Sequence, residues 1–345
     1  MHCTLVPPYI LQALARQQDP VVRDAAISTL GLDRTFAVNR LLGDASRRRA
    51  VLGAPVAAGL RRLVHDAHGE EELPGDLVRG EGDPATGDAA ADEAYDGLGA
   101  TWRLYEDVYG RSSIDDAGLA LSGSVHFGQQ YDNAYWDGEQ MVFGDGDGVL
   151  FTRFTVAVDV IGHELTHGVT GATADLEYRG QPGALNESMS DVFGSLVKQH
   201  ALGQTAEEAD WLIGAGLLAA DVQGVALRSM KAPGTAYDDA RLGGKDPQPA
   251  HVRDSLRTTS DNGGVHTNSG IPNHAFYLAA VGLGGHAWER AGRVWYDVLA
   301  GGDLQATATF PQLARLTVAA ADRLLGGDAR RTVAEAWRGV GVVVP

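Results

Sequence analysis

The stretch VIGHELTHGV, residues 160–169, constrains the fold of this chain most strongly. It places His163 and His167 four positions apart, with Glu164 directly after the first histidine. On an α-helix, residues i and i+4 lie on one face about one turn apart, so both imidazoles can bind the same metal ion. Glu164 is rotated by about 100° from His163 and can flank that ion without binding it. Because two histidines at this spacing also occur as ordinary surface residues, a metal site requires a further ligand.

A second helical segment, GALNESMSDVFG at residues 183–194, offers that ligand. A catalytic zinc site commonly has three protein ligands and one open position for water. We therefore expect Glu187 to join His163 and His167 as a ligand of one Zn²⁺. Asp191, one helical turn after Glu187, is expected to accept the second N–H group of a zinc-bound histidine. An amphipathic helix with solvated acids is the alternative, but the apolar residues around both acids favour an interior cleft.

The chain changes character twice along its length. Residues 1–50 are expected to form short helices that end in the basic stretch GDASRRRAVLGAP, an accessible cleavage site or an ordinary exposed linker. Residues 51–158 are rich in Gly, Asp and aromatic residues, which predicts strands and turns with one helix near residues 92–110. Residues 159–345 show helical periodicity. The predicted fold class is α+β with a strand-rich N-terminal lobe, a mainly helical C-terminal lobe and the histidine helix at their junction, where clefts form.

Charge and hydropathy exclude several kinds of partner. The net charge of -17 would repel nucleic acid, so we expect no nucleic-acid partner. No apolar run approaches the roughly 18 residues of a membrane span, and we expect a monomer that does not bind membranes. Pro7 and Pro8 interrupt the apolar part of the N-terminus and no basic residues precede it, so no signal peptide is recognised. We therefore expect a cytoplasmic location as synthesised, with secretion by a non-classical route as the alternative.

Several long motifs, in the same order, resemble the thermolysin family of zinc metalloendopeptidases. They lie within residues 60–345 and are DNAYWDGEQMVFGDGDG, DVIGHELTHGVT, GALNESMSDVFGSLV, ALRSM and DNGGVHTNSGIPNHAFY. The chain also resembles the protealysin-like subgroup, whose short precursor segment bears a Pro-Pro-aromatic motif, here VPPYIL at residues 6–11. The resemblance implies a two-lobed thermolysin-like fold and a zinc-dependent neutral endopeptidase made as a self-inhibited precursor. Seven arginines and four aspartates give residues 1–50 a net charge of 7 - 4 = +3, which suits docking on the acidic remainder.

Chemistry and the resemblance together assign catalytic roles. A bound Zn²⁺ lowers the pKa of its water to about 7, and Glu164 is placed to take the proton and pass it to the leaving amine. The developing oxyanion needs hydrogen-bond donors besides the metal. The resemblance implies His266 and Tyr178 for that task, with Asp261 orienting His266.

The resemblance also implies a cleft for peptide or protein substrates. Arg228 is expected to hold a substrate carbonyl on the primed side, while Asn133 and Ala134 are expected to pair with the peptide backbone as an added strand. Four apolar residues match the family's pocket for the residue after the scissile bond, which predicts a bulky hydrophobic side chain there. Plain core packing is the alternative for each of them. These residues are Phe151, Phe154, Val160 and Leu227.

The chain departs from the family at a double calcium site. Asp159 and Asp210 match two of its ligands, whereas Lys198, Leu212 and Ala215 occupy positions where the site needs other ligands. None of these three side chains supplies a carboxylate, and Ca²⁺ takes six to eight oxygen ligands. We therefore expect the double site to be incomplete, with the Lys198 ammonium neutralising the remaining acids. A single weak Ca²⁺ is the alternative.

The single cysteine, Cys3, excludes an intramolecular disulfide and directly precedes the Pro-Pro motif region. A thiolate is a good zinc ligand, so Cys3 is a candidate inhibitory ligand in the precursor. Packing with Val6 and Ile10, or a disordered terminus, is the alternative.

Two other functions compete with proteolysis. A non-catalytic zinc-binding protein of the same fold could act as a binding or inhibitory module, but Glu164, His266 and the expected zinc ligands are all present. A metallohydrolase that acts on other substrates is disfavoured by Asn133 and Arg228.

Overall fold

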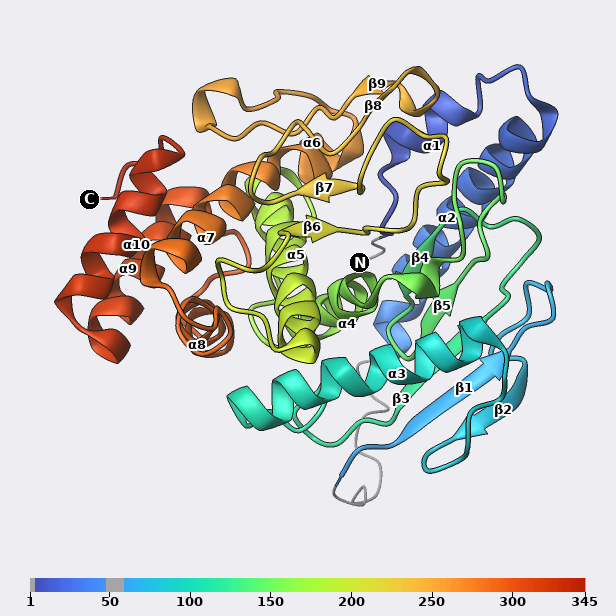
Figure 1. Cartoon of the computed structure of the whole chain (residues 1–345), viewed down its shortest axis with the longest axis horizontal. Helices are drawn as coiled ribbons and strands as arrows, with labels where there is room; N and C mark the ends of the chain where they lie inside the picture. The colour runs from blue at the N-terminus through green and yellow to red at the C-terminus, as the bar shows by residue number, and fades with distance from the viewer. Residues whose placement is uncertain (1–3, 48–58, 345) are drawn as a thin grey trace.

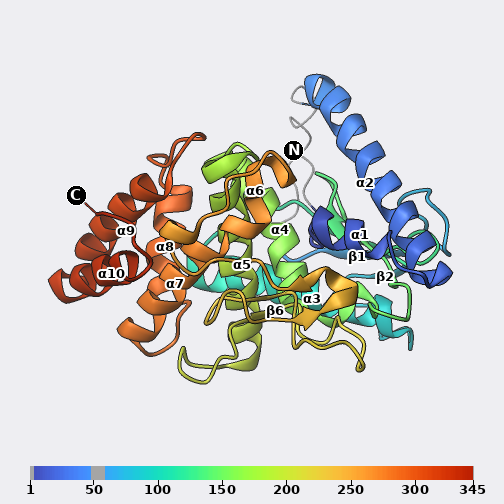
Figure 2. The same cartoon turned by 90° about the horizontal axis from the view of Figure 1, so that it is seen from above.

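The computed structural model describes residues 4–47 and 59–344 (Figure 1, Figure 2). Cys3, most of the arginine-rich stretch and the expected boundary between residues 50 and 51 lie outside these residues. The strands are β1 (Arg62–Asp66), β2 (Asp76–Gly80), β3 (Leu121–Val125), β4 (Ala134–Trp136), β5 (Met141–Phe143), β6 (Leu212–Ile213), β7 (Arg228–Ser229), β8 (Asp238–Asp239) and β9 (Gly244–Lys245). The α-helices are α1 (Pro8–Leu14), α2 (Pro20–Arg47), α3 (Ala89–Arg103), α4 (Val158–Ala172), α5 (Gly180–Leu202), α6 (Asp261–Asn268), α7 (Gly270–Leu283), α8 (Ala291–Ala300), α9 (Phe310–Leu325) and α10 (Gly327–Gly339).

The N-terminal lobe is built on a five-stranded sheet with the order β2-β1-β3-β5-β4. The central pairs β1–β3 and β3–β5 are parallel, and the outer pairs β1–β2 and β4–β5 are antiparallel. The helix expected near residues 92–110 is α3, which begins where Asp88 accepts a hydrogen bond from the Ala91 N–H over 2.8 Å. Helix α3 contacts β1 and β3, while α4 contacts β4 and β5. Strand β4 therefore forms one edge of the sheet, next to the helix that carries the two histidines.

The C-terminal lobe is mainly helical, and α7, α8, α9 and α10 lie together at the end of the molecule far from the sheet (Figure 1). Helix α9 begins with a reciprocal capping box between Thr309 and Gln312. Helix α5 ends at Gly203, whose φ of 66° is the left-handed conformation that glycine favours at such ends. The expected α+β fold with two lobes and the histidine helix at their junction is confirmed.

Helices α4 and α5 cross very closely because glycines lie at the crossing. An added Cβ at Gly194 would be 2.4 Å from the Asp159 carbonyl oxygen, and one at Gly162 would be 2.9 Å from Val197. Only glycine permits two helix backbones to approach in this way. This close crossing brings the histidines of α4 to Glu187 of α5.

Residues 4–47 contain α1 and α2, which lie beside each other on one side of the molecule (Figure 2). Pro8 begins α1, as expected of a proline in the first turn of a helix. The expectation of short helices is wrong for α2, which is 28 residues long. Gly31 lies inside this helix, where an isolated glycine costs only about 1 kcal/mol. Among the described residues, no helix combines the length and apolar character needed to cross a membrane.

Candidate metal centre and substrate cleft

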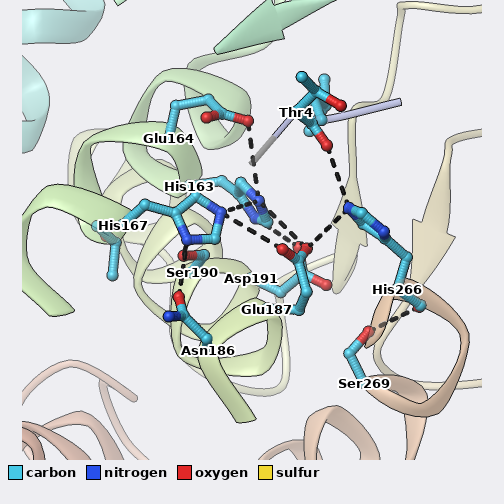
Figure 3. Close-up of polar contacts among 12 residues, drawn as sticks. Thr4, His163, Glu164, His167, Asn186, Glu187, Ser190, Asp191, His266 and Ser269 are labelled. Carbon is cyan, nitrogen blue, oxygen red and sulfur yellow. Dashed lines mark hydrogen bonds and ion pairs between the residues drawn. The ribbon is translucent and has the colours of Figure 1, made fainter. Parts of the chain in front are cut away.

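The two histidines of α4 and Glu187 of α5 meet in a buried cluster (Figure 3). His163 Nε2 lies 3.1 Å from His167 Nε2, and each nitrogen is 3.6 Å from an oxygen of Glu187. These separations match the edges of a tetrahedron around an ion with ligand bonds of about 2 Å. Within residues 4–47 and 59–344, this is the one group of three such side chains that can converge on a metal ion.

Hydrogen bonds to the outer ring nitrogens fix how both imidazoles face the cluster. His163 Nδ1 donates to Asp191 over 2.8 Å, as expected from the sequence, and His167 Nδ1 lies 2.8 Å from the amide oxygen of Asn186. Each Nε2 atom then carries a lone pair. The two lone pairs face each other, an arrangement that a cation stabilises. Burial lowers the pKa of His167 to about 3, so its ring is neutral as a metal ligand must be. The donor set therefore fits Zn²⁺.

Glu164 lies beside the cluster, with one carboxylate oxygen toward Trp136 and the other toward His163. Its Oε2 accepts a hydrogen bond from the backbone N–H of Trp136 in β4 over 3.1 Å, and its Oε1 lies 4.0 Å from His163 Nε2. Complete burial, followed by the charge of Glu187, raises the pKa of Glu164 above its ordinary value. A carboxyl group that holds a proton more readily than usual suits general-base work.

His266 and Tyr178 reach the cluster from the side opposite Glu164. Although burial opposes its charge, Asp261 and then Glu187 raise the pKa of His266 to about 9. Asp261 Oδ1 contacts His266 Nδ1 over 2.6 Å. The hydroxyl of Tyr178 donates to Glu187 and lies 3.2 Å from His266 Nε2.

Asp261 is held by an unusual backbone turn that begins α6. Residues 261–264 all have positive φ, with values of 50° for Asp261 and 49° for Asn262, and two glycines complete the turn. This left-handed turn directs the Asp261 carboxylate to both the backbone N–H and the ring of His266.

Arg228 in β7 is coupled to the metal cluster through Asp191. Its guanidinium donates to both oxygens of Asp191 over 2.8 and 2.9 Å, and Asn273 donates to the same carboxylate over 2.8 Å. Burial opposes ionisation of Asp191, but Arg228 and His163 hold the pKa of that carboxyl well below its ordinary value. Arg228 keeps one nitrogen, Nη1, directed to the cleft.

Residues Thr4–Val6 of the N-terminal segment lie against these side chains and form backbone hydrogen bonds with them and with β4. Leu5 N donates to the Ala134 carbonyl over 3.2 Å, and the Leu5 carbonyl accepts from Arg228 Nη1 over 3.2 Å. Val6 N donates to Asn133 Oδ1 over 2.9 Å. The Thr4 carbonyl accepts from His266 Nε2 over 3.1 Å (Figure 3).

The apolar pocket residues predicted from the sequence are all buried in the core that also contains Leu5. The rings of Phe151 and Phe154 lie 5.6 Å apart. Burial alone agrees with a substrate pocket and with core packing, so the pocket role of Phe151, Phe154, Val160 and Leu227 remains a prediction.

Lys198 lies between the two acids that match ligands of the family's double calcium site, which was expected to be incomplete. Its ammonium is 2.7 Å from Asp159 and 2.9 Å from Asp210, and it donates to the Leu212 carbonyl over 2.8 Å. The Lys198 ammonium therefore lies between Asp159 and Asp210 and can neutralise both acids.

Comparisons with known proteins agree with this geometry. Residues 58–171 match the family model described as the thermolysin metallopeptidase catalytic domain, and residues 174–342 match its alpha-helical domain. The chain belongs to the thermolysin family of zinc metalloendopeptidases. It is 51% identical to an extracellular metalloprotease of Pectobacterium carotovorum over 99% of this chain and 97% of that protein. A thermolysin of Alicyclobacillus acidocaldarius is 40% identical over 81% of this chain and 50% of that protein.

The solved structure of the precursor of protealysin from Serratia proteamaculans matches this chain with a TM-score of 0.90. The two are 50% identical, and the match covers 99% of this chain and 100% of that one. The protein is therefore a zinc-dependent endopeptidase with a thermolysin-like fold, as the sequence predicted.

The expectation of a cytoplasmic location is contradicted by the family. The relatives from Pectobacterium carotovorum and Serratia marcescens are both named extracellular metalloproteases. The expectation rested on the lack of a recognisable signal peptide, which does not determine the final location of a protein.

Some residues of the site were assigned no role from the sequence. Asn186, which contacts His167, could have been found as a buried polar neighbour of Glu187. Asn273 and the backbone N–H of Trp136 could not, because no spacing rule connects them to Asp191 or Glu164.

Proposed function

We propose that the chain is the self-inhibited precursor of a secreted endopeptidase that cleaves before bulky hydrophobic residues. In this proposal residues 1–50 are the inhibitory segment, residues 51–158 the strand-rich lobe and residues 159–345 the helical lobe. The observation that carries the proposal is the register of Thr4–Val6, whose backbone forms in the cleft the hydrogen bonds that a bound peptide needs. Secretion is supported by the extracellular relatives.

Each residue of the cleft has one task in the proposed reaction. His163, His167 and Glu187 would hold Zn²⁺, which would lower the pKa of a bound water and polarise the substrate carbonyl. Glu164 Oε1 accepts the proton of the attacking water and later delivers it to the leaving amine.

The oxyanion is stabilised by groups on the other side of the cleft. His266 Nε2 donates to it, and the contact with the Thr4 carbonyl supports this role because that carbonyl precedes Leu5 in the chain. Tyr178 is the second donor, and Asp261 keeps the His266 ring oriented and charged.

The register of Thr4–Val6 also supports the proposed preference for a bulky hydrophobic residue after the scissile bond. With Thr4 before the scissile position, Leu5 takes the place of the residue after it, and Leu5 is completely buried. Burial of a leucine side chain contributes about 1.5–3 kcal/mol. In a set of peptides that differ only at this residue, kcat/KM is expected to be highest for Leu or Phe, at least about tenfold lower for Ala and lowest for Asp. Equal values for Leu and Asp would refute the specificity.

Inhibition is tested with the full chain. Leu5→Asp introduces a charge into a buried position, whereas Val21→Asp makes the same kind of change at an exposed position of the same segment. Hydrolysis of a quenched fluorescent peptide is followed while mass spectrometry confirms that the chains are intact. Leu5→Asp is expected to raise the activity of the intact chain at least about tenfold over Val21→Asp. Equal activities would refute inhibition by the segment.

A further inference from the structure

Helix α2 presents one face to the N-terminal lobe. This docking face consists of four residues spaced at i, i+3, i+4 and i+7, which places them on the same side of an α-helix. The four residues are Thr29, Leu32, Asp33 and Phe36. Ile27, on the opposite side of α2, is 53% exposed.

The apolar half of the docking face packs on an aromatic cluster that is separate from the main core. The cluster contains Phe127, Tyr131 and Tyr135, which are all at most 1% exposed. Phe36 stacks on Tyr135 with ring centroids 4.9 Å apart, and its centroid lies 5.8 Å from that of Phe127. Leu32 packs against the same cluster. Burial of these apolar side chains stabilises the contact between α2 and the lobe.

The polar half of the docking face forms hydrogen bonds with residues directly before β4. Thr29 is completely buried, and its hydroxyl accepts from Asp132 N over 3.0 Å. Asp33 Oδ1 accepts from the hydroxyl of Tyr131 over 2.6 Å, and its Oδ2 accepts from Asn133 Nδ2 over 3.1 Å. Because a carboxylate only accepts hydrogen bonds, the ionised form of Asp33 satisfies both donors.

Asn133 joins the docking face to Thr4–Val6. Its Nδ2 donates to Asp33, so its Oδ1 faces the other way and accepts from Val6 N over 2.9 Å. If the Asn133 amide turned over, its oxygen would lie against a carboxylate oxygen and its nitrogen against the Val6 N–H group. Asp33 therefore fixes the orientation of the amide that Val6 needs.

Packing between α1 and α2 gives a second connection. Val22 and Ala26 near the start of α2 are buried in the main core, as are Leu11 and Leu14 of α1. Helices α1 and α2 contact each other, and α1 begins two residues after Val6. The docking face and Thr4–Val6 are thus parts of one packed unit.

We propose that the aromatic cluster and Asn133 together form a docking site for α2, and that this docking keeps Thr4–Val6 in the cleft. The inference rests on the proposed inhibition by the N-terminal segment and adds how that segment is held. Opening of the cleft then requires release of α2 as well as of the three residues beside the metal cluster.

The test measures hydrogen exchange of the Leu5 and Val6 amides in the full chain with Glu164→Gln, which keeps the shape of the side chain and prevents self-cleavage. Both amides donate hydrogen bonds in the cleft, so their protection reports how often Thr4–Val6 leaves it. Exchange is followed by mass spectrometry of the N-terminal peptide.

Two variants weaken the docking without changing Thr4–Val6. Phe36→Ala removes the stacked ring, and Ile27→Ala is its control on the exposed side of α2. Asp33→Ala removes both hydrogen bonds of the carboxylate, and Asp24→Ala is its exposed control. The measurements are made at pH 8 with ionised Asp33, because burial raises the pKa of this group to about 7 against its two hydrogen bonds.

Protection of the Leu5 and Val6 amides is expected to fall at least about tenfold in both docking variants and to match the parent in both controls. Protection of α5 is expected to stay at the parent level in all four chains, which shows that the two lobes remain folded. Unchanged protection of Leu5 and Val6 in Phe36→Ala or in Asp33→Ala would overturn the docking. If Phe36→Ala unfolds the whole chain, Asp33→Ala decides by the same criterion.

Peptide hydrolysis by intact chains with native Glu164 separates the docking from the inhibition itself. If Phe36→Ala lowers the protection of Thr4–Val6 while hydrolysis stays at the parent level, the docking stands and inhibition by the segment is wrong. If Leu5→Asp activates the intact chain but Phe36→Ala leaves Thr4–Val6 protected, the inhibition stands and the docking is wrong.

Discussion

Asn186 holds His167 in a single tautomer. The Asn186 amide nitrogen donates to the Leu176 carbonyl over 3.1 Å, so its oxygen must face His167 Nδ1, 2.8 Å away. His167 Nδ1 must then carry the proton, which leaves Nε2 free to bind a metal ion. The Leu176 carbonyl thus sets the orientation of His167 through Asn186.

Asn186→Ala is expected to weaken zinc binding by about 10–100-fold, because His167 loses the contact that orients it. Zinc affinity is measured by competition with a chromophoric chelator. Gln199→Ala removes a buried amide from the same helix without touching the cluster and serves as the control. If both variants bind zinc equally well, Asn186 has no role in orienting His167.

Glu164→Ala is expected to leave a folded, zinc-loaded protein with kcat lowered by about 10²–10⁴-fold, because it removes the proton acceptor and none of the metal ligands. His163→Ala is expected to lose both zinc and activity. Zinc content and casein hydrolysis distinguish the two variants, and mass spectrometry shows whether each chain stays at full length. Proteolysis at the wild-type rate by Glu164→Ala would contradict the assigned base.

Calcium is expected to matter little for stability, because the Lys198 ammonium lies between Asp159 and Asp210. A calcium-selective chelator should leave the melting temperature unchanged. Lys198→Ala leaves the buried Asp159 without its partner and is expected to cost about 3–5 kcal/mol of stability, unlike the exposed Lys231→Ala. A large loss of melting temperature on chelation, reversed by calcium alone, would contradict this expectation.

Asp132→Asn is expected to stabilise the protein increasingly as pH rises above 4. Burial, and then the charge of Asp147, raises the pKa of Asp132, although the backbone of Asp147 favours the charged form. An acid with a raised pKa contributes stability at low pH that is lost as pH rises, by about 1.4 kcal/mol per pH unit. Asparagine stays neutral at every pH.

Urea unfolding from pH 5 to 8 measures this difference, with Asp303→Asn as the exposed control. A constant difference in the free energy of unfolding between Asp132→Asn and the parent would show that Asp132 does not titrate in this range.

The zinc ligands could be predicted from the sequence because helix geometry links His163 to His167 at a fixed spacing. Predicting Glu187 as the third ligand required only a second helix close to α4. Gly162 and Gly194 allow α4 and α5 to come into contact. The substrate-binding role of Arg228 required the family resemblance, and its contact with Asp191 was not predicted, because a short strand between loops has no periodic signal.

The contacts of the N-terminal segment were beyond the reach of sequence patterns. Asp33 and Asn133 are separated by 100 positions, and Asp33 stands among ordinary residues of a polar helix. Only the fold brings them together. The length of α2 was also missed, since tertiary contacts of Phe36 and Asp33 outweigh the local cost of Gly31.

Strand β4 must keep one edge free if peptides are to be added to it, and a free strand edge is also where other chains can attach and aggregate. In this chain Leu5 bonds to that edge at Ala134. In the precursor proposed above, this contact covers an edge of β4 until the segment is removed. Protection of a strand edge from other chains and the proposed inhibition of the enzyme would then depend on the same backbone contact.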